Sequence, residues 1–302
     1  MNTFANGPSS APTDAQNGLS IPTGSFNFSA ELLARNKSRP HKIAYIDDKG
    51  SLSYGQLHTA TQQVAGLLKN ANIGIEARVL LLMHDNCDWP VCFLGTLYAG
   101  CVSVAVNTLL TSDDYAYMLE HSRAQAVFVS AALLPTLHQA LEKYPQHEVQ
   151  KIWVSGEVNE YASNETNLQQ ALLGQTPLTQ ESKTNADDPA FWLYSSGSTG
   201  RPKGTVHSHA NPIYTAHYYG CGVLNIQEND VCFSAAKLFF AYGLGNSLTF
   251  PLYVGATVVL MAERPTPEAT FKRWIEQQPT IFFGEPTGYA GMLASAHLPA
   301  NE

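Results

Sequence analysis

The sequence has no excess of basic residues and no basic run. Its 302 residues include 17 Lys and Arg against 25 Asp and Glu, which gives a formal net charge of −8. Proteins that bind nucleic acid usually present a basic surface to the phosphate backbone, so we expect no nucleic-acid partner. An anionic ligand would have to be bound locally, by backbone amides and one or two cations.

Long apolar runs and a secretory leader are also missing. No stretch approaches the roughly 18 consecutive apolar residues of a membrane-spanning helix, so we expect a soluble protein without a membrane partner. Residues 1–24 are rich in Ser, Pro, Asn and Gly, without the basic start and apolar core of a signal peptide, and predict a disordered tail. The five cysteines form no Cys-x-x-Cys pair, which indicates free thiols in a reducing cytoplasm.

What the chain does have is the size and hydrophobicity of a folded enzyme, with 44% hydrophobic and 14% charged residues. Two alternating segments around Asp48-Lys49-Gly50 predict a hairpin, and Ser53 with Gln56 predicts a capped helix. Apolar segments then alternate with helical patterns, which predicts an α/β fold with parallel crossovers. The strands of this first block are expected near 79–83, 102–106, 126–130 and 151–155, and its helices near 89–99, from 112, and over 131–144.

A second structured block begins at a buried strand over 189–194. Residues 156–188, which precede it, are polar and rich in turn formers, so they predict a surface excursion. Further strands are expected near 231–235, 256–261 and 280–283, with a helix over 267–277. No helix or strand is predicted after these elements.

The segment that carries chemistry is the loop over 194–204, which reads Tyr-Ser-Ser-Gly-Ser-Thr-Gly-Arg-Pro-Lys-Gly directly after a predicted strand. Glycines let backbone N–H groups approach phosphate oxygens, hydroxyls add short hydrogen bonds, and lysine adds a point charge. The loop matches neither the Walker pattern nor the dinucleotide Gly-x-Gly-x-x-Gly pattern. A flexible Ser/Gly linker is the alternative, although linkers rarely follow a buried strand or end in Pro-Lys-Gly.

This loop resembles the signature Ser-Ser-Gly-Ser-Thr-Gly-x-Pro-Lys-Gly of the adenylate-forming superfamily of acyl-CoA synthetases. Residues 237–246, Lys-Leu-Phe-Phe-Ala-Tyr-Gly-Leu-Gly-Asn, are similar to the version in benzoate-CoA and 4-hydroxybenzoate-CoA ligases, and the similarity runs from about Phe26 to Glu302. Segments 107–111, 205–211, 262–266 and 283–287 resemble the same subgroup. The resemblance implies a layered αβαβα-type N-terminal AMP-binding domain with parallel-rich sheets, present in part over 25–302, with the C-terminal domain absent.

The resemblance also implies a two-step reaction. A carboxylate attacks the α-phosphorus of Mg-ATP to form an acyl-adenylate and pyrophosphate, and the thiol of coenzyme A then displaces AMP. The expected function is therefore a cytoplasmic ATP-dependent aryl-CoA ligase of aromatic catabolism that uses an aromatic acid, ATP, Mg²⁺ and CoA, and a homodimer is allowed. Hydroxyls, amides and a lysine are suited to hold the departing pyrophosphate. The predicted nucleotide-binding residues are Ser195, Ser196, Gly197, Ser198, Thr199, Gly200 and Lys203.

A second cluster resembles the segment that lines the acyl pocket of these ligases. Aromatic walls with small residues between them offer a flat slot for a planar benzoate, and each edge-to-face contact contributes about 0.5–1.5 kcal/mol beyond burial. Ordinary core aromatics are the alternative for any one of these positions. The predicted acid-binding residues are Phe239, Phe240, Ala241, Tyr242 and Gly243.

Several functional parts of the family are expected downstream of Glu302, among them the catalytic lysine, so no catalytic residue is assigned in this chain. Lys203 belongs to the loop and is not that lysine. Glu285 departs from the family, which has an apolar residue at this position. We keep two alternatives to an aryl-CoA ligase. One is an adenylating ligase for another carboxylic acid, and the other is a non-catalytic, truncated nucleotide-binding fragment.

Paired histidines and acidic residues offer no convincing metal or catalytic site. His207 and His209 lie two residues apart without a third ligand nearby, so no protein-bound metal is predicted. The pairs His84-Asp85 and Asp113-Asp114 are interpreted as loop or capping residues.

Overall fold

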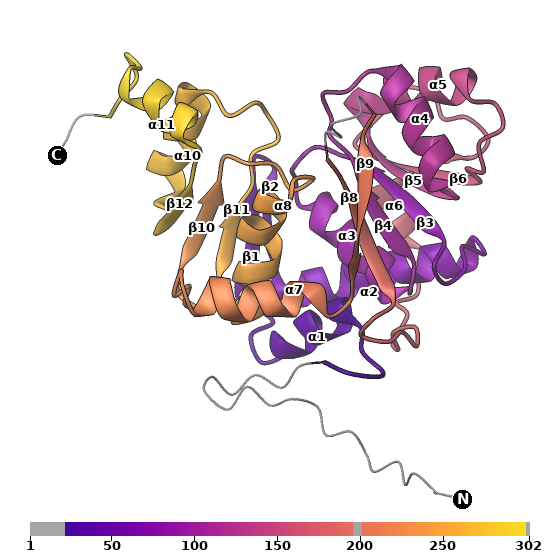
Figure 1. Cartoon of the computed structure of the whole chain (residues 1–302), viewed down its shortest axis with the longest axis horizontal. Helices are drawn as coiled ribbons and strands as arrows, with labels where there is room; N and C mark the ends of the chain where they lie inside the picture. The colour runs from indigo at the N-terminus through magenta and orange to yellow at the C-terminus, as the bar shows by residue number, and fades with distance from the viewer. Residues whose placement is uncertain (1–21, 196–200, 300–302) are drawn as a thin grey trace, which may run out of the picture.

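The computed structural model describes residues 22–195 and 201–299, and they form two sheets surrounded by helices, placed side by side in Figure 1. One sheet has the order β7 (Glu165–Asn167), β6 (Lys151–Ser155), β5 (Ala126–Ser130), β3 (Arg78–Leu82), β4 (Val102–Ala105), β8 (Pro189–Ser195) and β9 (Lys203–Ser208). The other has the order β12 (Ile281–Phe283), β10 (Val231–Ser234), β11 (Thr257–Val259), β1 (Ile43–Asp47) and β2 (Gly50–Ser53).

Parallel pairing dominates both sheets. The β8–β9 and β1–β2 pairs are antiparallel, and the other neighbouring strands are parallel. The α/β class and the parallel-rich sheets predicted from the alternating pattern are confirmed, because apolar strands covered on both faces read as continuous hydrophobic segments.

The helices begin and end largely where the sequence signals indicate. Ser53 and Gln56 form the predicted capping box of α2, and Thr111 with Asp114 forms another at α4. The helices are α1 (Phe28–Arg35), α2 (Tyr54–Asn70), α3 (Asp88–Tyr98), α4 (Ser112–Ser122), α5 (Leu134–Lys143), α6 (Leu168–Leu173), α7 (Asn211–Tyr214), α8 (Ala241–Leu244), α9 (Phe250–Val254), α10 (Pro267–Gln277) and α11 (Pro286–Leu293). Residues Ala131–Leu133 form a 3₁₀ turn, and Thr215–Cys221 and Gly245–Thr249 are π-helical.

The largest core lies around α3, which is buried along almost its whole length. Trp89 stacks on Phe93 with ring centroids 5.1 Å apart, and Phe93 meets Phe191 of β8 edge-on. A second core packs α4 and α5 against the opposite face of the seven-stranded sheet. All five cysteines are free thiols, as predicted, and Cys92, Cys101 and Cys232 are buried.

Two sequence-based expectations were wrong. The surface excursion over 156–188 contains β7 and α6, and the segment after β12 forms α11. β7 escaped detection because its buried residues are polar: Glu165 accepts a hydrogen bond from the Ala162 amide, and Asn167 caps α6. α11 buries no residue and contains two glycines, so it lacks the apolar face that predicts a helix.

The predicted tail is described only at its end, since residues 1–21 lie outside the described part of the chain. Gly24 is already attached to the body, where its carbonyl accepts a hydrogen bond of 2.8 Å from the Ala186 amide. Within the described residues, no helix combines the length and apolar character needed to cross a bilayer.

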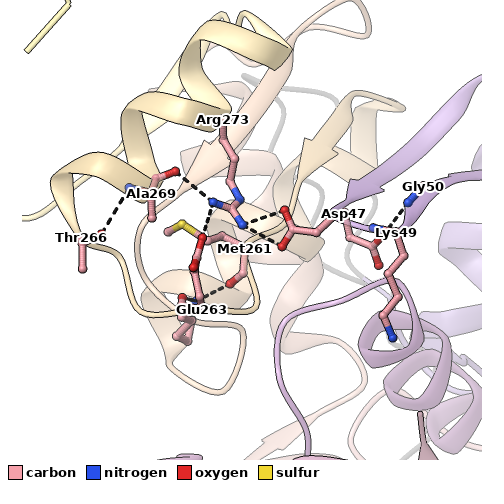
Figure 2. A network of polar contacts seen from close by, with 10 residues as sticks. Asp47, Lys49, Gly50, Met261, Glu263, Thr266, Ala269 and Arg273 are labelled. Atoms are coloured by element: carbon pink, nitrogen blue, oxygen red, sulfur yellow. Dashed lines mark hydrogen bonds and ion pairs between the residues drawn. The ribbon is translucent and has the colours of Figure 1, made fainter. Parts of the chain in front are cut away.

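A charged network joins the turn between β1 and β2 to α10 and to the loop that follows β11, and Figure 2 shows part of it. Arg273 of α10 donates two hydrogen bonds of 2.7 Å to the Asp48 carboxylate and one of 2.7 Å to Glu263. Lys237 donates to the carbonyls of Met261 and Glu263 in the same loop. Through Lys237, the network also holds the residues that lead into the predicted acid-binding segment.

Candidate nucleotide-binding site

The structure places the two ends of the predicted phosphate loop on one hairpin. Ser195 is the last residue of β8, Lys203 is the first of β9, and the two are cross-strand partners at the edge of the seven-stranded sheet. Both residues are exposed to solvent. The other predicted residues of the loop lie outside the described residues: Ser196, Gly197, Ser198, Thr199 and Gly200.

The predicted acid-binding segment lies where the chain enters α8. Phe239 and Gly243 are buried, whereas Phe240, Ala241 and Tyr242 are exposed. The rings of Phe239 and Phe240 lie 4.5 Å apart and are tilted by 56°. The segment therefore combines a buried anchor with an exposed aromatic surface.

Gly243 lies unusually close to the backbone that precedes it. A Cβ atom at this position would lie 2.0 Å from the carbonyl oxygen of Lys237, so only glycine fits. The segment from residue 237 to residue 243 is therefore folded tightly on itself.

Glu285, the residue that departs from the family pattern, belongs to the surroundings of this segment. Burial raises the pKa of the Tyr242 hydroxyl, and the charges of Tyr289, Tyr219 and Glu285 raise it further. A carboxylate this close to Tyr242 adds negative charge to a surface predicted to bind an acid. Nothing in the described residues explains why position 285 is a glutamate.

Asp85 has a position that its sequence interpretation did not anticipate. It is 4% exposed, and its Oδ2 accepts a hydrogen bond of 3.0 Å from the backbone amide of Leu238. Burial raises its pKa to about 7, against the opposing effects of the Lys237 charge and the Leu238 amide. Burial also lowers the pKa of Lys237, which Asp85 opposes. Asp85 thus has a structural role, because it ties the loop that follows β3 to the start of the predicted acid-binding segment.

The other histidine and acidic residues have structural positions. His207 stacks on Phe191 at 4.7 Å, and the Nδ1 of buried His209 accepts a hydrogen bond of 3.2 Å from the Phe28 amide. Asp114 is the capping-box residue of α4, as interpreted, and Asp113 pairs with Lys143 at 2.8 Å. Over 22–195 and 201–299, no three His, Cys, Asp or Glu residues are grouped as metal ligands would be.

Sequence reasoning missed two residues of α4 that contact the stem of the loop, by which we mean the flanking residues 192–195 and 201–204. Tyr117 donates a hydrogen bond of 3.1 Å to the carbonyl of Pro202, and Nδ1 of His121 lies 2.8 Å from the hydroxyl of Tyr194. The only signal in the sequence is their spacing of four residues, which places both on one face of the helix.

Helix α7 follows the end of β9 that lies away from Lys203. It contacts both β9 and the π-helical turn over Gly245–Thr249, which continues α8. One short helix therefore packs the hairpin that carries the predicted phosphate loop against the helix that begins within the predicted acid-binding segment.

Comparison with known proteins gives the family and several similar ligases. The family model described as AMP-binding enzyme matches residues 32–302. The benzoate–CoA ligase of Thauera aromatica is 47% identical over 278 residues, which cover 91% of this chain and 51% of that protein. The 4-hydroxybenzoate–CoA/benzoate–CoA ligase of Rhodopseudomonas palustris is 41% identical over 276 residues, 91% of this chain and 50% of that protein.

Solved structures show the same similarity in three dimensions. A benzoate CoA ligase from Burkholderia xenovorans LB400 is 50% identical and superimposes with a TM-score of 0.84, covering 91% of this chain and 53% of that one. The anthranilate CoA ligase AuaEII, solved with anthranoyl-AMP, is 31% identical with a TM-score of 0.86. The chain spans about half the length of the relatives it matches.

Proposed function

The chain belongs to the family of AMP-binding enzymes, and we propose that it provides the phosphate-binding stem and the acid-binding segment of an ATP-dependent aryl-CoA ligase of the benzoate type. The observation that carries this proposal is the pairing of Ser195 with Lys203 at the two ends of the signature loop. In the proposed reaction, an aromatic carboxylate attacks the α-phosphorus of ATP, pyrophosphate leaves, and the thiol of CoA then displaces AMP.

Lys203 and Ser195 are proposed to bind the departing pyrophosphate. Negative charge builds on the leaving phosphates as the acyl-adenylate forms, and an ammonium group and a hydroxyl fixed before the reaction stabilise it without reorganisation. The remaining predicted loop residues, Ser196, Gly197, Ser198, Thr199 and Gly200, are proposed to add hydroxyls and backbone amides to the same phosphates.

Phe239, Phe240 and Tyr242 are proposed to hold the ring of the acid, with Ala241 and Gly243 leaving room for it. Aromatic rings bind other aromatic rings better than alkyl chains of similar size, which favours an aryl acid. The names of the similar ligases support this choice of substrate. The exposed edge of Phe240 offers the contact surface.

Magnesium and coenzyme A complete the proposal. Mg²⁺ would neutralise charge on the ATP phosphates. The described residues offer no cluster of protein ligands for this ion, so we assign no residue to it. No catalytic residue is assigned in this chain, and the transfer to CoA is proposed to depend on the half of the relatives' length that the chain does not span. Any dimer is likewise a proposal.

The test is carboxylate-dependent exchange between ATP and labelled pyrophosphate, measured on the chain and on the longest polypeptide that the gene encodes. We expect exchange stimulated by benzoate or a hydroxybenzoate, lowered about tenfold or more by Lys203→Ala because a charge-assisted hydrogen bond is lost. Lys183→Ala, an exposed lysine on another loop, is the matched control and should leave exchange unchanged.

Three outcomes separate the alternatives. Exchange with acetate or fatty acids but not with aromatic acids contradicts the aryl assignment and favours another carboxylic acid. Exchange that is insensitive to Lys203→Ala contradicts the phosphate role. Nucleotide binding without exchange for any acid, in both polypeptides, favours a non-catalytic protein.

A further inference from the structure

The outer face of α4 lies against the stem of the phosphate loop. Tyr115, Met118 and Leu119 form the buried face of this helix in the second core. Tyr117 and His121 lie four residues apart on another face, with their rings stacked at 5.5 Å. These two side chains contact β8 and the two residues that precede β9.

Before β9, the contacts are made at the two residues that precede Lys203. The Tyr117 hydroxyl donates a hydrogen bond of 3.1 Å to the carbonyl of Pro202. The Arg201 guanidinium lies over the Tyr117 ring, with Cζ 5.1 Å from the centroid, which is a cation–π geometry. Two consecutive residues that lead into Lys203 are therefore held by one side chain of α4.

On β8, the contacts are made beside Ser195. Nδ1 of His121 lies 2.8 Å from the hydroxyl of Tyr194, and the His121 ring meets the rings of Trp192 and Tyr194 edge-on. The backbone of β9 lies directly against this cluster, because a Cβ at Gly204 would lie 3.2 Å from Trp192 and 3.6 Å from His121. Both ends of the loop are thus in contact with the same face of α4.

α4 is itself well fixed. Its capping box joins Thr111 to Asp114, with Asp114 Oδ2 accepting from the Thr111 amide at 3.0 Å. Lys143 of α5 donates to the carboxylate of Asp113 at 2.8 Å and to the hydroxyl of Ser112 at 2.9 Å. The helix is therefore a firm support for an exposed hairpin at the edge of the sheet.

We propose that Tyr117 and His121 are positioning residues, which hold Ser195 and Lys203 in the register that binds the polyphosphate of ATP. The inference rests on the proposed function of the loop. An exposed lysine on an edge strand gains affinity for phosphate when its backbone is ordered before the ligand arrives, because less conformational entropy is then lost on binding. Neither residue is proposed to touch the nucleotide.

The test compares four variants of the chain. Tyr117→Phe removes the hydrogen bond to Pro202 and keeps the ring, and His121→Leu removes the hydrogen bond to Tyr194. His121→Asn keeps a hydrogen-bonding atom at the δ position. Tyr115→Phe is the matched control, because it also deletes a tyrosine hydroxyl of the same helix, on the buried face. This hydroxyl donates a hydrogen bond of 2.7 Å to the carbonyl of Asn107.

The first measurement is ATP affinity by titration calorimetry. Since one hydrogen bond is typically worth about 0.5–1.5 kcal/mol, we expect Tyr117→Phe and His121→Leu each to weaken binding about two- to tenfold. His121→Asn should restore most of the loss, and Tyr115→Phe should leave affinity unchanged even where it lowers the melting temperature. Melting temperatures of all variants are recorded beside the affinities.

The second measurement is tryptic cleavage between Lys203 and Gly204, which needs no ligand. Arg201 precedes a proline and resists trypsin, so the two products, 1–203 and 204–302, report on this bond alone. We expect cleavage about two- to tenfold faster in Tyr117→Phe and His121→Leu, since the same hydrogen bonds are lost, and unchanged in Tyr115→Phe.

The outcomes distinguish the positioning role of Tyr117 and His121 from the proposed phosphate-binding function of the loop. If Lys203→Ala weakens ATP binding while Tyr117→Phe and His121→Leu change neither affinity nor cleavage, the positioning role is wrong and the function of the loop stands. Losses of affinity that follow melting temperature across all variants, Tyr115→Phe included, also overturn the positioning role. If the wild-type chain binds no ATP, the proposed function fails for this chain, and unchanged cleavage at Lys203 then overturns the positioning role as well.

Discussion

The Asp85 carboxylate accepts a 3.0 Å hydrogen bond from the Leu238 amide. This contact joins the loop that follows β3 of one sheet to the start of the proposed acid-binding segment, which follows β10 of the other sheet. Asp85 Oδ1 has no hydrogen-bond partner within 22–195 and 201–299. A buried carboxylate with half of its acceptor capacity unused is costly when it is charged. The contact therefore has a consequence for the pH dependence of stability.

Asp85→Asn should change that pH dependence in one direction. Burial raises the pKa of Asp85 from 3.8 to about 7, so its contribution to stability is fully present at low pH and is lost as the pH rises to about 7. Asparagine cannot ionise and still accepts from Leu238. Between pH 4 and pH 8 the variant should gain at most about 4 kcal/mol relative to the wild type, measured by urea unfolding.

The matched charge control is Asp113→Asn, an exposed carboxylate on α4. Stability curves of Asp85→Asn and the wild type that run parallel from pH 4 to pH 8 would show that Asp85 is not held in its neutral form.

His209→Asn should change the pH dependence of stability in the opposite direction, over a pH range that overlaps that of Asp85. Burial lowers the pKa of His209 from 6.5 to about 4, so the folded protein loses stability as the pH falls from 6.5 to 4, because the unfolded chain takes up the proton first. The loss amounts to about 3 kcal/mol and should disappear in His209→Asn, which keeps an acceptor for the Phe28 amide.

The comparison is the unfolding free energy at pH 7 and at pH 4.5, with His41→Asn as the exposed control. An acid loss that is as large in His209→Asn as in the wild type would contradict this assignment.

Arg273→Met should destabilise the five-stranded sheet. The Arg273 side chain is 5% exposed and joins Asp48 and Glu263, whose carboxylates are partly exposed and can be rehydrated when it is removed. We expect a loss of about 1.5–3 kcal/mol in the free energy of unfolding, the range for hydrogen bonds to charged groups. Arg123→Met is the control, because it breaks an exposed ion pair with Glu148 and should leave the unfolding midpoint unchanged. If Arg273→Met and Arg123→Met lower stability equally, the network of Arg273, Asp48 and Glu263 has no special role.

Gly243→Ala should disturb the acid-binding segment itself. The new Cβ would lie 2.0 Å from the Lys237 carbonyl, so the segment must shift, at a cost of about 2 kcal/mol or more. Gly288→Ala in α11 meets no atom within 4 Å and should be neutral or stabilising by about 0.5–1 kcal/mol. Thermal melting of both variants checks this, and a Gly243→Ala protein as stable as Gly288→Ala would contradict the close approach.

Much of the fold could be predicted from the sequence because its strands are apolar and its helices carry capping signals, as at Ser53 and Gln56. β7 could not, since the buried Glu165 and Asn167 satisfy their polar groups through contacts that composition does not reveal. Within the site, Lys203 and Ser195 follow from local chemistry. Asp85 does not, because its partner Leu238 is 153 residues away along the chain.

The most direct test of the central claim is to locate the nucleotide's phosphates chemically. An ATP analogue with a lysine-reactive acyl phosphate at its γ end should transfer its acyl group to Lys203, and excess ATP should prevent the transfer. Mass spectrometry of tryptic peptides identifies the modified lysine, since acylation also blocks cleavage at Lys203. ATP-protected labelling of Lys203 is the result we predict; labelling elsewhere with Lys203 unmodified, or labelling that ATP does not reduce, would contradict the account.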